Sequence, residues 1–138
     1  MRQVFGRRLW IGNAGDMRDP RTLLATGVEA VVELADNEQF ASLPRDLIRF
    51  RFPLSDAGAN PDWLLRLAID SVAALVKATV PTLVCCGCGL NRSVCVVAAG
   101  LALSDGRPLD EVLVAVAKAG PADVSPALLA RIREVVGS

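Results

Sequence analysis

The sequence predicts a single α/β domain over residues 1–138, with a central, mostly parallel sheet of four or five strands flanked by helices. Three observations predict this fold class. The chain is 52% hydrophobic and 22% charged, which fits a compact protein with buried strands. Short β-branched runs precede longer amphipathic stretches, so strands lie early and helices late. No repeat, low-complexity segment or linker divides the 138 residues, which suffice for one core.

The first expected elements are a strand, a helix and a second strand. Residues 7–13 (RRLWIGN) have the pattern of a short strand. A helix follows, because Asp19 can cap its N-terminus, Pro20 suits its first position and Gly27 suits its C-terminal end. Residues 28–34 are an unbroken apolar run rich in β-branched residues, which is typical of a buried strand.

A connection and a half-covered strand come next. Residues 37–46 have the composition of a connection with room for one helical turn, and residues 47–56 (LIRFRFPLSD) alternate apolar and arginine side chains. We expect the arginines of this strand to face solvent rather than substrate. The apolar face is Ile48, Phe50 and Phe52, and the opposite face is Arg49 and Arg51.

The second half of the chain is expected to be mostly helical. Residues 61–78 place apolar side chains three and four apart, so a long amphipathic helix opens at Asn60 and Pro61. Residues 80–86 (VPTLVCC) form a short apolar strand. A nearly all-apolar and therefore buried helix follows over residues 92–106.

The last two expected helices cover residues 108–120 and 125–136, and Ser125 can cap the second. The two tryptophans, Trp10 and Trp63, are too few for a base-stacking platform and are expected in the core or at its edge. No element requires a second domain.

Charge and composition exclude several classes of partner. Lysine plus arginine and aspartate plus glutamate number 15 each, so no net charge favours a nucleic acid or a membrane surface. The N-terminus lacks the long apolar core of a secretory signal, and no apolar run reaches the roughly 18 residues of a membrane span. We therefore expect a monomeric protein of the cytoplasm.

The chain has no histidine and four cysteines. Without histidine it cannot form a Ser-His-Asp triad, a Cys-His dyad or a His-ligated zinc site. Cysteines crowded within eleven residues indicate reduced thiols rather than a disulfide framework. A four-cysteine zinc site is disfavoured as well, since Cys85 and Cys86 point to opposite faces of a strand and Cys95 lies in a buried helix. We expect Cys85 and Cys95 to be structural.

The chemistry is concentrated in the turn CCGCGLNRS. A buried strand that leads through a glycine-rich turn, residues 87–91, into a helix forms an anion site, because backbone N–H groups converge and the helix dipole adds partial positive charge. Cys86 ends the strand at a place where the thiolate form is favoured. Arg92 adds a fork of donors that matches two oxygens of a phosphate. The pattern therefore predicts a cysteine nucleophile beside a phosphate-binding loop.

Cys86, Gly89, Arg92 and Ser93 spell C-x-x-G-x-x-R-S, which resembles the signature loop of the cysteine-dependent protein phosphatases and of their dual-specificity branch. The likeness covers essentially the whole chain. LWIGNAGDMRDPRTLLATGVEAVVEL is similar to the family's opening strand, first helix and second strand, FPLSDAGANPDWLLRLAIDSVAALV to its acid-bearing loop and following helix, and SPALLARIREVV to its last helix. The resemblance implies a protein-tyrosine-phosphatase-like fold, with Asp56, thirty residues before Cys86, as the general acid.

The resemblance also implies a hydrolase that cleaves phosphomonoesters, with phosphorylated proteins or small phosphomonoesters as substrates, and that needs no metal or organic cofactor. Cys86 would attack phosphorus to form a phosphocysteine, and Asp56 would protonate the leaving oxygen and then activate water. Ser93 would stabilise the departing thiolate. The phosphate oxygens would be held by Arg92 and by the backbone of Gly87, Cys88, Gly89, Leu90, Asn91 and Arg92.

Two positions depart from the family's pattern. Cys85 stands where a histidine usually precedes the nucleophile. A thiol is a much weaker hydrogen-bond donor than histidine, so this replacement affects the expected rate of catalysis. Cys88 stands where a small residue such as alanine is common. Two alternative functions stay open, namely a phosphate-binding module without catalysis and a thiol redox protein that uses Cys86 and Cys88. Asp62 is the alternative acid, although it suits the helix dipole better, and Asp56 could instead open an Asx turn.

Overall fold

The computed structural model describes residues 1–35, 46–56 and 59–137, and it confirms the predicted α/β fold class. A five-stranded sheet has the order β1-β2-β5-β3-β4. The strands β2, β5, β3 and β4 are parallel to one another, and the edge strand β1 pairs antiparallel with β2. The strands are β1 (Arg2–Gln3), β2 (Leu9–Asn13), β3 (Ala30–Ala35), β4 (Ile48–Leu54) and β5 (Thr82–Cys86).

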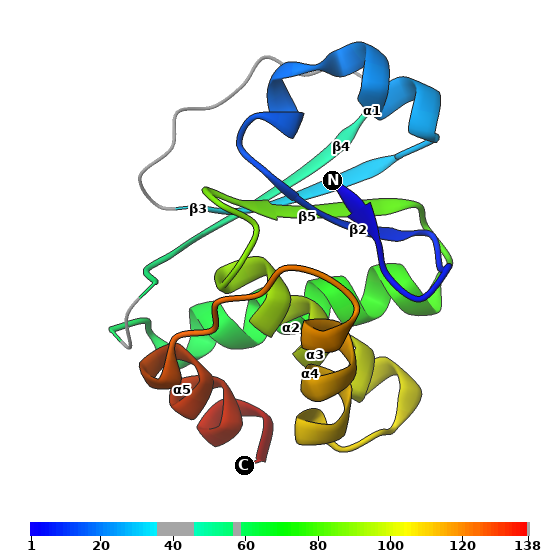
Figure 1. The fold of residues 1–138 in the computed structure, drawn as a ribbon. Helices are drawn as coiled ribbons and strands as arrows, with labels where there is room; N and C mark the ends of the chain where they lie inside the picture. Colours follow the sequence, from blue (N-terminus) through cyan, green and yellow to red (C-terminus); the bar gives the residue numbers. More distant parts are fainter. Residues whose placement is uncertain (36–45, 57–58, 138) are drawn as a thin grey trace.

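Helices cover both faces of the sheet (Figure 1). The short turn η1 (Asp16–Arg18) and α1 (Pro20–Thr26) lie on one face. The remaining four helices lie on the other face. They are α2 (Asp62–Lys77), α3 (Arg92–Asp105), α4 (Leu109–Lys118) and α5 (Pro126–Gly137). None of the helices in the described part of the chain combines the length and the apolar character needed to cross a membrane.

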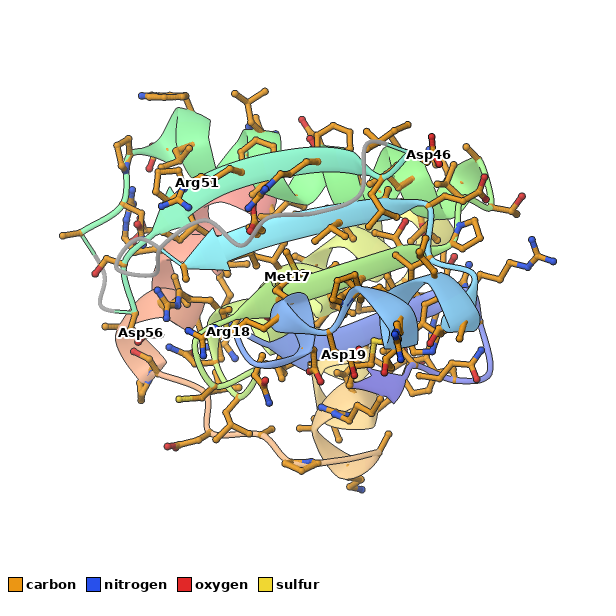
Figure 2. All side chains as sticks on the ribbon, turned by 90° about the horizontal axis from the view of Figure 1, so that it is seen from above. Met17, Arg18, Asp19, Asp46, Arg51 and Asp56 are labelled. Carbon is orange, nitrogen blue, oxygen red and sulfur yellow. The ribbon has the colours of Figure 1, made fainter. Side chains whose placement is uncertain are left out.

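The two faces of the sheet have separate cores. The larger core lies between the sheet and α2 to α5, and it contains Cys86. The smaller core lies under α1 and η1, and it contains Cys85 together with Met17, which lies over the middle of the sheet (Figure 2). Adjacent side chains of a strand point to opposite faces, so this division confirms the predicted separation of the two thiols.

The predicted helix ends are largely confirmed. The Asp19 side chain accepts a hydrogen bond from the Thr22 N–H at 3.2 Å, and Gly27 ends α1 with φ 85°. Ser125 Oγ accepts a hydrogen bond from the Leu128 N–H at 3.3 Å, as predicted for α5. The N-terminus of α2 differs, because its cap residue is Pro61, which has no side-chain bond to offer.

The sequence indicated that α2 opens at Asn60, but Asn60 does not cap this helix. Its side chain instead accepts a hydrogen bond from the Ser55 N–H at 2.8 Å and donates one to the Ser55 carbonyl oxygen at 3.0 Å. This pair of bonds joins the segment after β4 to the start of α2. Asn60 thus holds the chain on either side of Asp56, which follows β4 at the end opposite Asp46 (Figure 2).

Three predicted environments need correction. Ile48 is 57% exposed, while Phe50 and Phe52 stack at a ring distance of 6.5 Å and pack against the larger core. Arg49 does not simply face solvent, because it forms a two-bonded ion pair with Glu33 of β3 at 2.6 and 2.8 Å. Trp63 is 64% exposed on α2, so the prediction that it lies in the core or at its edge is wrong.

Other predictions on individual residues have mixed outcomes. Trp10 lies at the edge of the smaller core, as predicted. The connection predicted over residues 37–46 lies, except for its last residue, outside the described residues. Strand β1 was not predicted, because two residues carry no detectable periodicity.

Candidate active site

The candidate site lies at the C-terminal edge of the parallel strands. Cys86 is the last residue of β5, and the turn over residues 87–91 leads from it directly into α3. Ligands bind at this edge in open α/β sheets because the loops that follow the strands meet there. The predicted succession of strand, glycine-rich turn and buried helix is therefore confirmed.

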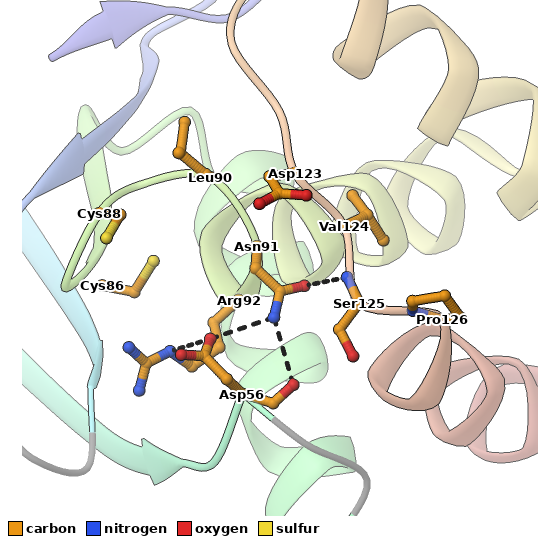
Figure 3. A pocket seen from close by; sticks show the side chains of 10 residues that line it. All are labelled: Asp56, Cys86, Cys88, Leu90, Asn91, Arg92, Asp123, Val124, Ser125 and Pro126. Carbon is orange, nitrogen blue, oxygen red and sulfur yellow. Dashed lines mark hydrogen bonds and ion pairs between the residues drawn. The ribbon is translucent and has the colours of Figure 1, made fainter.

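A pocket of about 550 Å³ opens at this edge (Figure 3). Three segments far apart in the sequence form its wall, and they bring Asp56, Cys86 and Arg92 together. Gly87, Gly89 and Ser93 are not part of this wall. The lining residues are Asp56, Cys86, Cys88, Leu90, Asn91, Arg92, Asp123, Val124, Ser125 and Pro126.

Gly89 allows the loop to lie directly against β2. Its φ is 73°, a conformation that favours glycine, and a Cβ placed there would lie 2.7 Å from the Gly12 carbonyl oxygen. A second contact joins the same two segments, since the Ala14 N–H donates to the Gly87 carbonyl oxygen at 3.3 Å. The end of β2 therefore supports the back of the loop.

Arg92 is the buried positive charge of the pocket. Its side chain is only 5% exposed, and Nη1 donates to the Leu54 carbonyl oxygen at 2.9 Å. Its Nε lies 3.0 Å from Oδ1 of Asp56. Arginine stays protonated in proteins, so a buried guanidinium needs an anionic partner. Asp56 supplies that charge here, at the place where the resemblance puts a phosphate.

Asp56 faces the loop although 64% of its side chain is exposed. The Asn91 Nδ2 group donates to Oδ1 of Asp56 at 3.1 Å and to its carbonyl oxygen at 3.2 Å. Asp62, the alternative acid, lies in the first turn of α2, forms an ion pair with Arg131 and does not line the pocket. The geometry favours Asp56 over Asp62 as the carboxyl group of this site.

Ser93, Cys85 and Cys95 are buried and do not line the pocket. Ser93 is fully buried, and within the described ranges its Oγ has no hydrogen-bond partner. Burial raises the pKa of the Cys95 thiol to about 12, with a smaller contribution from Cys86. Burial also raises the pKa of the Cys85 thiol well above its usual range, helped by the charge of Glu33. Cys85 and Cys95 are therefore held as neutral thiols.

Cys85 does not occupy the pocket side of β5. It packs on the opposite face of the sheet among apolar side chains, and no disulfide joins any of the four cysteines. Cys88 is exposed and lines the pocket. In the described part of the chain, no group of three or more His, Cys, Asp or Glu side chains is placed to hold a metal ion.

Sequence reasoning missed one wall of the pocket, the segment 123–126 between α4 and α5. Two hydrogen bonds attach it to the loop: the Asp123 N–H donates to the Leu90 carbonyl oxygen at 2.9 Å, and the Ser125 N–H donates to Asn91 Oδ1 at 2.8 Å. Ser125 was predicted only as a helix cap. No local pattern predicts such contacts, because they depend on the packing of α3 against α4 and α5.

Three solved structures are similar to this one over almost the whole chain. Human DUSP28 has a TM-score of 0.84 and 23% identity, over 97% of this chain and 94% of that one. A mouse protein described as a dual specificity phosphatase, solved with zinc tungstate, has a TM-score of 0.82 and 25% identity, over 94% of this chain and 82% of that one. DUSP15 has a TM-score of 0.82 and 22% identity, over 99% of this chain and 86% of that one.

At the level of sequence the result is different, since no protein-family model and no curated protein matches the chain. The structural likeness nevertheless agrees with the C-x-x-G-x-x-R-S loop and with its position between β5 and α3. The fold resemblance predicted from that loop is confirmed. The protein therefore has the fold of the dual-specificity phosphatases.

Proposed function

We propose that the protein is a phosphatase that hydrolyses phosphomonoesters through a phosphocysteine at Cys86. The observation that supports this most is the convergence of three groups in one pocket: the Cys86 thiol at the end of β5, the buried Arg92 guanidinium and the Asp56 carboxyl group. These groups can act as nucleophile, anion binder and proton donor. Among the similar structures, the mouse protein carries tungstate, which is a tetrahedral oxyanion like phosphate.

The first step of the proposed reaction transfers the phosphoryl group to sulfur. The Cys86 thiolate attacks phosphorus, the S–P bond forms, and the bond from phosphorus to the ester oxygen breaks. Asp56 in its protonated form gives its proton to that oxygen, so the leaving group departs as an alcohol or phenol. Arg92 and the N–H groups of residues 87–92 stabilise the charge on the remaining oxygens.

The second step returns the enzyme to its starting state. The Asp56 carboxylate takes a proton from water while the water oxygen attacks phosphorus, which releases inorganic phosphate and the Cys86 thiolate. Ser93 supports this step, because a buried hydroxyl without a partner in the described ranges can donate a hydrogen bond to a neighbouring thiolate. The proposed substrates are phosphorylated proteins or small phosphomonoesters.

Substrate binding must rearrange one contact. Arg92 Nε lies 3.0 Å from Oδ1 of Asp56, so an incoming phosphate competes with the Asp56 carboxylate for the guanidinium. Protonation of Asp56 removes that competition and at the same time produces the acid that the first step requires. The proposed reaction therefore binds the phosphate most readily when Asp56 is neutral.

The test is turnover of p-nitrophenyl phosphate by the wild type and three variants. We expect Cys86→Ser and Arg92→Ala to lose turnover, while Arg107→Ala keeps it, because Arg107 forms an exposed ion pair with Glu111 outside the pocket. Rapid acid quenching followed by mass spectrometry should find a phosphate adduct on Cys86. Turnover that survives in Cys86→Ser would overturn the proposal.

One observation favours a second candidate, a phosphate-binding module without catalysis. Cys85 replaces the usual histidine, and its side chain lies in the smaller core as a neutral thiol, so it offers the loop little hydrogen bonding. This candidate predicts that the wild type binds phosphate or tungstate but releases no p-nitrophenol. A burst of product equal to the amount of enzyme would exclude it.

A further inference from the structure

One side chain, Asn91, joins all three segments that form the pocket (Figure 3). Its Nδ2 group donates to the carboxylate and the carbonyl oxygen of Asp56, and its Oδ1 accepts from the Ser125 N–H. The orientation of the amide is set by these partners, since Ser125 N–H can only donate and the oxygens of Asp56 can only accept. Asn91 therefore acts as a hydrogen-bond donor toward Asp56 and as an acceptor from Ser125.

The two bonds from Nδ2 differ in what they hold. The bond to the Asp56 carbonyl oxygen, at 3.2 Å, holds the backbone that follows β4. The bond to Oδ1, at 3.1 Å, holds the carboxyl group itself. Because the Asp56 side chain is 64% exposed, little packing restrains it apart from these polar contacts. Asn91 therefore contacts both the backbone and the carboxyl group of Asp56.

The same contacts choose the oxygen that carries the acidic proton. Oδ1 of Asp56 accepts from Asn91 Nδ2 and faces Arg92 Nε. An oxygen that accepts from the Asn91 N–H group and lies beside the positive charge of Arg92 is a poor place for a proton, so in the neutral acid the proton belongs on Oδ2. When a phosphate takes over Arg92, the Asn91 bond still holds Oδ1. The acidic proton is then directed away from Asn91.

From this geometry we infer that Asn91 is a positioning residue that orients Asp56 as the general acid, in addition to any contact of its backbone with phosphate. The inference rests on the proposed phosphatase function. Aspartate at this position could accept from Ser125 but could not donate to Asp56, and alanine could do neither. These two substitutions therefore separate the two roles of the side chain.

The test uses substrates that differ in their need for an acid. Phenyl phosphate has a leaving group that needs a proton, whereas 2,4-dinitrophenyl phosphate has one that departs without it. We expect Asn91→Asp and Asn91→Ala to lower kcat for phenyl phosphate by roughly ten- to a hundredfold, which is less than the 10²–10⁴-fold loss expected when a general acid is removed altogether. The loss of kcat for 2,4-dinitrophenyl phosphate should be at least about tenfold smaller, because its leaving group needs no proton.

A double-mutant comparison separates positioning from a structural role. In an Asp56→Asn background, Asn91→Asp should cause no further loss for phenyl phosphate, because no acid remains to be oriented. If Asn91 only anchors the segment 123–126, Asn91→Asp keeps the bond from Ser125 and should resemble the wild type. Circular dichroism and urea unfolding check that each variant folds, and Asn91→Asp decides the test if Asn91→Ala does not fold.

Three outcomes would overturn the inference. Equal losses for both substrates would show that Asn91 shapes the pocket rather than the acid. Additive losses in the Asp56→Asn background would show that it acts independently of Asp56. A wild type without turnover of either substrate would overturn the proposed function and this inference together, whereas the first two outcomes leave the proposed function intact.

Discussion

The two sides of the pocket are built differently. On the nucleophile side, Cys86, Arg92 and Ser93 are buried, and the strand, the turn and the helix that carry them are continuous in the chain. On the acid side, Asp56 is mostly exposed and reaches the loop through side-chain contacts with Asn91 and Arg92. Burial preorganises the first side, whereas the second depends on polar contacts that a phosphate can replace.

The largest expected effect comes from adding a methyl group inside the loop. Gly89→Ala combines a positive φ with a Cβ 2.7 Å from the Gly12 carbonyl oxygen, so either the loop or β2 must move. We expect a loss of about 2–5 kcal/mol in the free energy of unfolding and loss of phosphate binding. Urea unfolding and calorimetric titration with phosphate measure the two effects.

Gly106→Ala is the matched control for this change. Gly106 ends α3 with φ 66°, but no atom lies within 4 Å of the place of its Cβ. We expect a cost of about 1–2 kcal/mol and normal phosphate binding. Equal losses in the two variants would show that the contact with Gly12 does not matter, and that the nucleophile side is less rigid than the structure indicates.

The next effect concerns the acid side. Asp56→Asn should lower kcat for phenyl phosphate by about 10²–10⁴-fold, since a general acid is lost. It should also bind phosphate about fivefold more tightly, because the carboxylate 3.0 Å from Arg92 Nε no longer competes for the guanidinium, a gain of about 1 kcal/mol. Steady-state kinetics and calorimetric titration test the two parts.

Asp110→Asn serves as the control for Asp56→Asn. It removes a carboxylate that is paired with Arg133 outside the pocket, so neither kcat nor phosphate affinity should change. If Asp56→Asn weakened phosphate binding, Asp56 would support the anion site instead of competing for it, and the contrast between the two sides would fail.

Thiol labelling gives a smaller effect that distinguishes the buried thiols from the exposed one. Because burial raises the pKa of Cys85 above its usual range and that of Cys95 to about 12, both stay protonated at pH 8. We expect iodoacetamide to modify the exposed Cys88 in the native protein and to leave Cys85 and Cys95 unmodified. Peptide mass spectrometry gives the extent at each site.

Unfolding in urea is the control for this labelling. All four thiols should then react at similar rates, because the burial that raises the pKa of two of them is lost. Native labelling of Cys85 as fast as Cys88 would contradict its place in the smaller core.

The smallest effect is expected far from the pocket, where Arg7 donates two hydrogen bonds to Asp105 at 2.6 and 3.2 Å. The Arg7 guanidinium, with a smaller part from Ser104, lowers the pKa of Asp105. A lowered carboxyl pKa stabilises the fold above the unfolded pKa of about 4, and this stability is lost as the pH falls through the folded value.

Arg7→Ala should therefore reduce the free energy of unfolding by less than about 1 kcal/mol at pH 7, since the pair is largely exposed. The difference from the wild type should shrink as the pH falls below the unfolded pKa of about 4. Urea unfolding at pH 7 and over a series of lower pH values measures it, and a difference that grows at low pH would contradict the assignment.

The sequence predicted the parts whose signals are local. The strand that ends at Cys86, the glycine turn and the apolar helix after Arg92 follow one another directly, so composition and spacing were sufficient. The environments of Trp63 and Asn60 were predicted wrongly, because both depend on tertiary packing. Trp63 stays exposed, whereas Asn60 bonds to Ser55 once the chain has folded. The wall formed by residues 123–126 had no local signal at all.

The amino-acid sequence by itself determined the order of strands and helices and the chemistry of the loop from Cys86 to Ser93, because periodicity, glycine and the pairing of thiol with guanidinium are properties of neighbouring residues. Only the tertiary structure decided that Asp56 rather than Asp62 meets Arg92, and that Asn91 joins three segments. Those facts depend on residues about 35 positions apart meeting in space, and hydrogen bonds over such separations form only when the whole core has packed.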